Sequence, residues 1–595
     1  MNYYDFYTGR EFEAYRFLGA HLSENGTVFR TFAPGAVSVS LIGDFSQWQE
    51  QPMNRIYNGG FWELSVPEAG EGMRYKFRIY RTDGTFRDHC DPYGFSAELR
   101  PNTASVICSL HGYVFQDGEW MEKRTSGYDR PVNIYELHFG SWKKKGDGEM
   151  DWYSYGELAP LLIPYLRENG YNFVELMPLA EYPSDASWGY QETGYFAPTS
   201  RYGTPDGLRE FVDLCHQSGI GVLLDFVPVH FAPDDYALWN YDGTALYEYP
   251  STDVGVSQWG SCNFMHSRGE VRSFLQSSAW YWLKEFHFDG LRMDAVSNLV
   301  YWQGQPERGT CQPGIQFLQN MNAGLKERMP EILLIAEDST AFSGVTAPVG
   351  EGGLGFDYKW DMGWMNDTLN YFRTDPTVRE SQRGQLTFSM DYFFRERYLL
   401  PLSHDESVHG KATVLQKMYG NYEDKFPQGR AFYLYMTGHP GKKLNFMGNE
   451  FGQLREWDER REQDWNLLSY PLHQGFLRLI RDLNHLYLTR PALYRDDYSR
   501  EGFQWIPCTQ EHGCVFAFER RSGSERLLFL FNFSSETEER CCAGLSQCAG
   551  LKTLLDTDWE IYGGSRPTNS AGPDLSDGQA VCSLAPFSGL CCLIL

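Results

Sequence analysis

The stretch GLRMDAV, residues 290–296, combines the two features that decide the fold of this 595-residue chain. It is a short, largely apolar run that follows the helix-like segment VRSFLQSSAWYWLKEF at 271–286, yet it carries Arg292 and Asp294 in its middle. Strands of a parallel sheet are buried on both faces and are nearly all apolar. The stretch therefore indicates a buried parallel strand whose charged pair needs a separate reason.

Short apolar runs of this kind recur between about residues 132 and 490, with segments of helical period between them. Eight such β-then-α units predict a (β/α)₈ TIM barrel with insertions. An open doubly wound sheet is the alternative, and the absence of a GxGxxG turn after every run counts against its dinucleotide-binding form. The runs are NIYELHF (133–139), FVELMPL (173–179), GVLLDFVP (221–228), GLRMDAV (290–296), EILLIAED (331–338), YLLPLSHDE (398–406), KKLNFMGNE (442–450) and the weaker FDYKWDMG (356–363).

The regions on either side of the barrel have a different pattern of apolar and polar residues. Apolar and polar residues alternate between Gly and Pro turns at about 15–110 and again after about 495, which is typical of antiparallel β-structure. The polar segment QDGEWMEKRTSGYDRP (116–131) is interpreted as a linker. We therefore expect an N-terminal β-sandwich at 1–115, the barrel at 116–490 and a C-terminal β-sandwich at 491–595.

Composition narrows the possible partners and location. The chain is 42% hydrophobic and 22% charged, with a net charge of −26, which disfavours binding to nucleic acid or to an anionic membrane surface. The N-terminus has no secretory signal and no apolar run approaches the roughly 18 residues of a membrane span. The 13 cysteines lack CxxC spacing and are expected to be mostly buried, reduced thiols of a cytoplasmic protein.

Charged residues gather at the ends of the predicted strands, where the active sites of TIM barrels lie. Four carboxylates meeting at one rim would repel one another, so stability alone does not explain them. The residues are Asp225 on the third strand and His230 just beyond it, Arg292 and Asp294 on the fourth, Glu337 at the end of the fifth, and His404 and Asp405 at the end of the seventh.

The spacing of Arg292 and Asp294 predicts an ion pair on the inner face of the barrel, because side chains two apart on a strand point the same way. A nearby cation lowers the pKa of a carboxylate, so Asp294 is expected to be ionised. A buried structural ion pair remains the alternative for these two residues. Glu337 has no basic neighbour in sequence and is the candidate for a protonated acid/base.

The other residues have alternative interpretations. Single histidines such as His230 and His404 are commonly structural. Tyr190, in WGY (188–190), is either a core residue or a sugar-stacking one. A metal site is disfavoured because no paired-ligand spacing is present. One ionised and one protonated carboxylate across a cleft is what cleavage of a glycosidic bond requires.

The blocks DFVPVH (225–230), GLRMDAV (290–296), IAEDS (335–339) and LSHDE (402–406) resemble the signature blocks of the α-amylase superfamily, whose members act on α-glucosidic bonds with retention. Longer segments, such as ELMPLAEYPSDASWGYQETGYFAPTSRYGTPD from Glu175, resemble the 1,4-α-glucan (glycogen) branching enzymes within it. The segment RTFAPGAVSVSLIGDFSQW (30–48) resembles the carbohydrate-binding module that precedes such barrels.

This resemblance implies an activity and a role for each site residue. It implies a glycosyltransferase that breaks an α-1,4 bond and forms an α-1,6 branch, with an α-glucan as its substrate, no cofactor, no metal ion and a monomeric state. Trp48 would either touch glucan or lie in the core of the N-terminal module. The implied roles are nucleophile for Asp294, acid/base for Glu337, transition-state stabiliser for Asp405, glucose binding for Asp225, His230, Arg292 and His404, and ring stacking for Tyr190.

Two other functions stay open at this stage. Water and a sugar hydroxyl need the same base, so the site residues alone do not separate a transferase from an α-glucan hydrolase. A glucan-binding scaffold without activity is the second alternative, although both carboxylates that catalysis needs are present.

Overall fold

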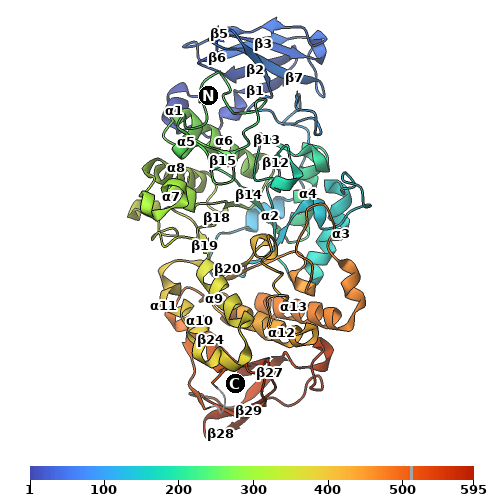
Figure 1. Cartoon of the computed structure of the whole chain (residues 1–595), viewed down its shortest axis with the longest axis vertical. Coiled ribbons are helices and arrows are strands. Elements are labelled where there is room, and N and C mark those ends of the chain that lie inside the picture. Colours follow the sequence, from blue (N-terminus) through green and yellow to red (C-terminus); the bar gives the residue numbers. More distant parts are fainter. Residues whose placement is uncertain (510–512) are drawn as a thin grey trace. The chain divides into compact units, whose positions relative to one another are not determined.

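The computed structural model describes residues 1–509 and 513–595. The chain divides into two compact units, whose elements are labelled in Figure 1. The first comprises Met1–Ser126, His138–Ile163 and Glu175–Asp357. The second comprises Gly127–Leu137, Pro164–Val174 and Tyr358–Leu595.

Within the described residues, eight strands form a closed barrel. Each predicted apolar run contains one of these strands, so the predicted (β/α)₈ barrel is confirmed and the open sheet is excluded. The strands, in their order around the barrel, are β10 (Asn133–Leu137), β11 (Phe173–Leu176), β14 (Gly221–Phe226), β17 (Gly290–Met293), β18 (Leu333–Ala336), β19 (Tyr358–Trp360), β20 (Tyr398–Leu402) and β21 (Lys442–Phe446).

A longer helix follows each barrel strand along the chain except β18, after which the described residues contain only the 3₁₀ turn Val349–Glu351 before β19. Some of these helices begin with a side-chain cap. Helix α4 is an example: the hydroxyl of Thr204 accepts a hydrogen bond from the backbone of Gly207, and Pro205 occupies the first turn. No helix in residues 1–509 or 513–595 is long and apolar enough to cross a bilayer. The longer helices are α3 (Tyr155–Glu168), α4 (Pro205–Gln217), α6 (Gly269–Glu285), α8 (Gln312–Arg328), α9 (Met362–Arg373), α12 (Tyr422–Gly438) and α13 (Pro471–Thr489). The short ones are α1 (Tyr3–Thr8), α2 (Gly118–Lys123), α5 (Thr252–Gly255), α7 (Ser297–Val300), α10 (Gly384–Thr387) and α11 (Ser389–Tyr392).

The N-terminal region folds into the predicted β-structure, with antiparallel sheets in the orders β1-β2-β6-β5 and β4-β3-β7-β8, and β9 added beside β7. Trp48 lies outside the core of this region: 38% of the residue surface is exposed, so the core interpretation of Trp48 is wrong. The strands are β1 (Gly19–Ser23), β2 (Gly26–Phe32), β3 (Ser38–Gly43), β4 (Gln51–Pro52), β5 (Asn54–Ile56), β6 (Phe61–Val66), β7 (Arg74–Tyr80), β8 (Phe86–His89) and β9 (Ser105–Val106).

The C-terminal strands also form antiparallel sheets, in the orders β22-β24-β25-β30-β27 and β23-β26-β29-β28. Alternate residues of β24 serve two cores: Phe516 and Phe518 join a cluster with helix α12, whereas Val515 and Ala517 join a cluster with the second sheet. The strands are β22 (Phe503–Trp505), β23 (Cys508–Thr509), β24 (Val515–Ser522), β25 (Glu525–Asn532), β26 (Glu538–Gly544), β27 (Leu551–Asp556), β28 (Asp574–Ser576), β29 (Gln579–Leu584) and β30 (Ser588–Ile594).

All 13 cysteines lie among the described residues and all are free thiols. Eight of them are buried, as the sequence predicted. The CC pairs at 541–542 and 591–592 help to fill the C-terminal cores: Cys541 and Cys592 belong to one apolar cluster and Cys591 to the other. These residues act there as small apolar side chains.

The segment interpreted as a linker is more structured than its polar sequence indicated. It contains helix α2, and Asp117 just before this helix lies 2.8 Å from Nδ1 of His216. The other ring nitrogen of His216 lies 2.9 Å from Asp289, which also accepts a hydrogen bond from Trp120. Asp289 directly precedes β17, so this buried network anchors the segment to the barrel.

The His216 network makes stability depend on pH. Burial alone would lower the pKa of His216, but Asp289 and Asp117 outweigh it and raise the pKa to about 9. The folded state therefore binds the proton more tightly than the unfolded chain, where the pKa is about 6.5. This contribution, about 3 kcal/mol, is fully present below pH 6.5 and is lost as the pH rises through 9.

We expect the thermal midpoint of the wild-type protein to decrease as the pH rises from 6.5 to 9. The variant His216→Gln should lose most of this pH dependence. His473→Gln is the matched control, because burial lowers the pKa of His473 instead. Equal pH dependence in the wild-type and His216→Gln proteins would contradict the assignment.

Candidate active site

Arg292 lies at the centre of a cluster of carboxylates in the first unit. The parallel register of β14 and β17 places Asp225 opposite Arg292. Nη1 of Arg292 lies 2.7 Å from both carboxylate oxygens of Asp225 and 2.8 Å from Oδ1 of Asp294. Nη2 lies 3.8 Å from Oε2 of Glu337. One buried guanidinium thus contacts carboxylates that follow or occupy three neighbouring strands.

These neighbours decide the charge of Arg292. Burial alone would lower its pKa, but Asp225, Tyr190, Asp294 and Glu337 together raise it well above the ordinary value. The guanidinium therefore stays charged. Its side chain is only 1% exposed, and an interior charge of this kind requires such partners.

Glu337 accepts hydrogen bonds from the backbone that directly follows Asp294. The N–H of Ala295 donates to Oε2 of Glu337 at 2.7 Å, and the N–H of Val296 donates to the carbonyl of Glu337 at 2.9 Å. Ala295 has a φ of +48°, which a residue with a side chain adopts rarely. This strained turn holds the residue after Asp294 directly against Glu337.

The two carboxylates remain accessible, whereas their partners are enclosed. The side chains of Asp294 and Glu337 are 14% and 15% exposed, against 1% for Asp225. A partly open pair over a buried cation is suited to reaction with a ligand. A structural ion pair does not require that opening.

Tyr190 reaches this cluster from the loop between β12 (Ala180–Glu181) and β13 (Gly194–Pro198). Its hydroxyl donates to Oδ2 of Asp225 at 2.6 Å. The loop requires Gly189, because its φ is +95° and a Cβ there would lie 2.6 Å from the carbonyl oxygen of Pro178. The turn therefore fixes the position of Tyr190.

His230, the first residue of β15 (His230–Phe231), is buried, and burial lowers its pKa to about 4. The ring is therefore neutral near pH 7. In the described part of the chain its Nδ1 has no hydrogen-bond partner. Its ring centre lies 5.1 Å from that of Trp259, a side chain that is 45% exposed.

His404 and Asp405 lie in the second unit, in the 3₁₀ turn His404–Ser407 that follows β20. Glu136, on β10, receives the backbone N–H of His404 at 2.9 Å and lies 2.6 Å from Nδ1 of its ring. The other ring nitrogen lies 3.4 Å from Oδ1 of Asp405. The Asp405 side chain is 43% exposed. A buried carboxylate therefore orients the histidine that borders an accessible aspartate.

The structure thus joins Tyr190, Asp225, Arg292, Asp294 and Glu337 into one hydrogen-bonded or charged cluster in the first unit. It joins His404 and Asp405 into another in the second. His230 lies in the first unit beside an exposed tryptophan.

Sequence reasoning missed three residues of these clusters. Glu136 lies within an apolar strand run, the same signal that identified Asp225, so the sequence could have revealed it. Trp259 and Glu192 lie in loops without a pattern. Burial, followed by the charges of Asp225 and Asp294, raises the pKa of Glu192 well above its ordinary value.

No group of three or more His, Cys, Asp or Glu side chains in the described ranges is arranged to hold a metal ion.

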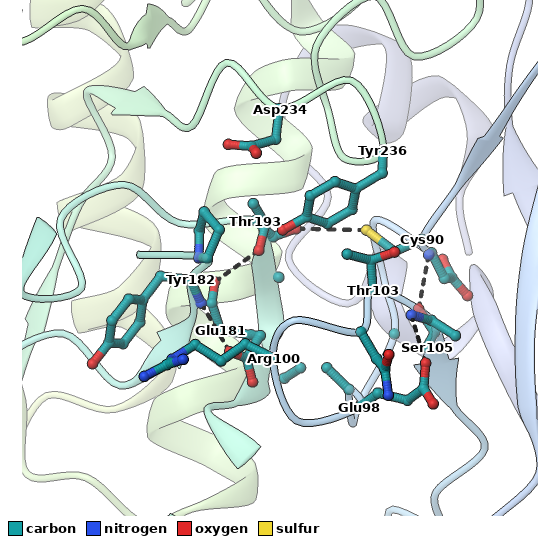
Figure 2. A pocket seen from close by; sticks show the side chains of 18 of the residues that line it. Cys90, Glu98, Arg100, Thr103, Ser105, Glu181, Tyr182, Thr193, Asp234 and Tyr236 are labelled. Carbon is teal, nitrogen blue, oxygen red and sulfur yellow. Dashed lines mark hydrogen bonds between the residues drawn. The ribbon is translucent and has the colours of Figure 1, made fainter. Parts of the chain in front are cut away.

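A separate cavity of about 250 Å³ in the first unit has a different character (Figure 2). It lies between the segment after β8 and the β12–β13 hairpin, and no residue of the carboxylate clusters is among the described residues that line it. Its polar groups tie these two segments together: Arg100 bonds to Asp185 at 3.1 Å, and the hydroxyl of Ser200 donates to the carbonyl of Glu98 at 3.1 Å.

The closed parallel barrel, with its cation-bound aspartate and neighbouring glutamate, agrees with the α-amylase class that the sequence blocks resemble. Family models agree with this class: carbohydrate-binding module 48 (isoamylase N-terminal domain) matches residues 17–94, the α-amylase catalytic domain matches 144–242, and the α-amylase C-terminal all-β domain matches 505–592.

Curated relatives define the family within this class. The chain is 45% identical over 573 residues to the 1,4-alpha-glucan branching enzyme GlgB of Fusobacterium nucleatum, covering 95% of this chain and 93% of that protein. It is 44% identical to the enzyme of the same name from Bacillus subtilis, covering 95% and 92%. The chain belongs to the 1,4-α-glucan branching enzyme family.

Solved structures show the same fold at greater distance. The pullulanase from an Anoxybacillus species, solved with maltotetraose, matches with a TM-score of 0.74 at 17% identity, covering all of this chain and 89% of that one.

Proposed function

We propose that this protein is a 1,4-α-glucan branching enzyme, a glycosyltransferase that cleaves an α-1,4 glucosidic bond and transfers the released chain to a glucose 6-hydroxyl. The observation that supports this chemistry is the set of contacts that holds Asp294 and Glu337 close together. Arg292 contacts both carboxylates, and the backbone N–H after Asp294 donates a hydrogen bond to Glu337. A retaining mechanism needs two carboxyl groups only about 5 Å apart.

The first step forms a covalent intermediate. Glu337 donates its proton to the departing glycosidic oxygen while an oxygen of Asp294 attacks the anomeric carbon. The carbon–oxygen bond of the glucan breaks, a glycosyl ester with inverted configuration forms on Asp294, and the rest of the donor leaves as an alcohol. The positive charge of Arg292 favours the ionised form of Asp294 that this attack requires.

The second step transfers the chain. Glu337, now ionised, takes the proton of an acceptor 6-hydroxyl, whose oxygen attacks the same anomeric carbon and releases Asp294. Two inversions give an α-1,6 branch. Membership of the branching enzyme family supports the sugar hydroxyl as acceptor, since water would need the same base.

The other residues would bind the glucosyl unit at the bond that is cleaved. Asp225, His230, Arg292 and His404 would contact this unit, and Tyr190 would stack beneath its ring. Asp405 would stabilise the positive charge that develops in the transition state. This assignment requires Asp405 and Asp294 to face the same glucosyl unit.

The activity is tested by incubating the protein with amylose. We expect iodine staining to fall with little new reducing sugar, and a debranching enzyme to release new short chains from the product. A rise in reducing ends in step with the loss of stain would identify a hydrolase instead. Binding of amylose without any change in it would identify a scaffold.

The enzyme is proposed to work in the cytoplasm, without nucleic acid or membrane partners. The 13 free thiols suit the cytoplasm, and the net charge of −26 does not suit nucleic acid or anionic membranes as partners. We expect a monomer near 68.6 kDa by light scattering and full activity after dialysis against a chelator.

A further inference from the structure

A groove of about 770 Å³ lies in the second unit, between one face of helix α9 and the loop 406–419. On the loop side, the first lining residue is Glu406, which directly follows Asp405. The groove therefore starts at the loop that carries one of the proposed active-site carboxylates. Its volume falls within the range of ligand sites, roughly 300–1,000 Å³.

The α9 side of the groove is a polar stripe on a fixed helix. Asn366, Asn370 and Arg373 are exposed and line the groove at positions i, i+4 and i+7, which share one face of a helix. The opposite face, including Trp364 and Phe372, is buried in the core. The two asparagine side chains both donate and accept hydrogen bonds, as vicinal sugar hydroxyls do.

The loop side is held in place by hydrogen bonds in its middle and at its last residue. Glu456 accepts the backbone N–H groups of Gly410 at 3.0 Å and Ala412 at 2.7 Å. The hydroxyl of Tyr419 donates to Asp375 at 2.7 Å, while 41% of the Tyr419 residue surface remains exposed. A fixed, accessible aromatic ring beside amide groups is suited to packing against a sugar face.

The charges in the groove favour a neutral ligand over an anion. Lys411 is paired with Glu406 at 3.2 Å. Lys417 is buried, and it donates to the carbonyl of Ala412 at 2.8 Å and also to that of Glu406. Burial lowers the pKa of Lys417 to about 8. Arg373 is the remaining lining cation, and it donates to the carbonyl of Lys411 at 3.4 Å.

We propose that this groove binds a run of α-1,4-linked glucosyl units and is a remote glucan subsite that determines the affinity for long chains. The inference rests on the proposed function for the identity of the polymer. Asn366 and Asn370 bind the sugar hydroxyls, and Tyr419 packs against a ring.

The test compares the double variant Asn370→Ala/Tyr419→Ala with the matched control Asn466→Ala/Tyr470→Ala, which removes an exposed asparagine and an exposed tyrosine elsewhere in the second unit. We expect the groove variant to raise KM for amylose about tenfold with kcat within about twofold, the loss expected for one or two ligand contacts. The rate with a short maltosyl fluoride donor, which does not extend into the groove, stays unchanged. The control variant keeps all wild-type values.

An unchanged KM for amylose in a folded variant would overturn the proposal, and so would an equal loss of kcat with long and short donors. If the protein binds inorganic phosphate more tightly than maltoheptaose, and if Arg373→Ala loses the phosphate binding, the groove is an anion site instead. These outcomes are separate from failure of the proposed function: a wild-type protein that only hydrolyses amylose still reports KM, and that KM still tests the groove.

Discussion

Asp294→Asn is expected to lower the rate of branching on the order of 10⁴-fold or more while leaving the fold intact. The asparagine side chain has nearly the same shape, but it has no carboxylate to attack the anomeric carbon. Arg292 keeps Asp225 at 2.7 Å, so the buried guanidinium retains a charged partner. The variant should therefore lose catalytic rate but keep the thermal stability of the wild-type protein.

The measurement is the initial rate on amylose together with the thermal midpoint of each protein. Asp234→Asn is the matched control, since Asp234 lies in the first unit and lines the separate cavity of Figure 2. This variant should keep the wild-type rate. If Asp294→Asn unfolds while the control does not, the pair with Arg292 is structural; if it retains more than about a tenth of the activity, Asp294 is not the nucleophile.

The barrel could be predicted from sequence because each strand leaves a local signal, a short apolar run followed by helical periodicity. The ends of the strands were less well marked. Strand β17 ends at Met293 and β18 at Ala336, so Asp294 and Glu337 are the first residues after their strands, although the backbone N–H of each still donates to the neighbouring strand. Apolarity does not record where a ladder ends, since the turns after these strands are also buried.

Contacts between distant segments were harder to predict. The sequence indicated that Arg292 pairs with Asp294, two residues away, but its shorter contacts are to Asp225, 67 residues earlier. That contact depends on the register of β14 against β17, which no local pattern specifies. The same limit applies to Glu136, which meets His404 across 268 residues.

Glu337 has more charged and polar neighbours in the structure than its sequence context indicated. It has no basic neighbour in sequence, yet Nη2 of Arg292 lies 3.8 Å from one of its oxygens, and a backbone N–H donates to the same oxygen. Both contacts favour an ionised Glu337. A proton on the other oxygen is compatible with this geometry, and substitution of Glu337 tests the acid role directly.

Glu337→Gln provides that test, because the loss should depend on the leaving group of the donor. With amylose as donor we expect a fall of about 10²–10⁴-fold, since the departing sugar oxygen needs a proton. With α-maltosyl fluoride the first step should be nearly unaffected, because fluoride leaves without protonation. The glutamine oxygen can still accept the Ala295 N–H, so the turn after Asp294 is preserved.

The second step gives an independent signal. Glu337→Gln also lacks the base that activates the acceptor, so a maltosyl ester on Asp294 should accumulate with the fluoride donor and be visible by intact-protein mass spectrometry. Asp294→Asn, given the same donor, should show no adduct. Equal losses with both donors and no adduct would remove Glu337 from proton transfer, because a general acid is required in proportion to how poor the leaving group is.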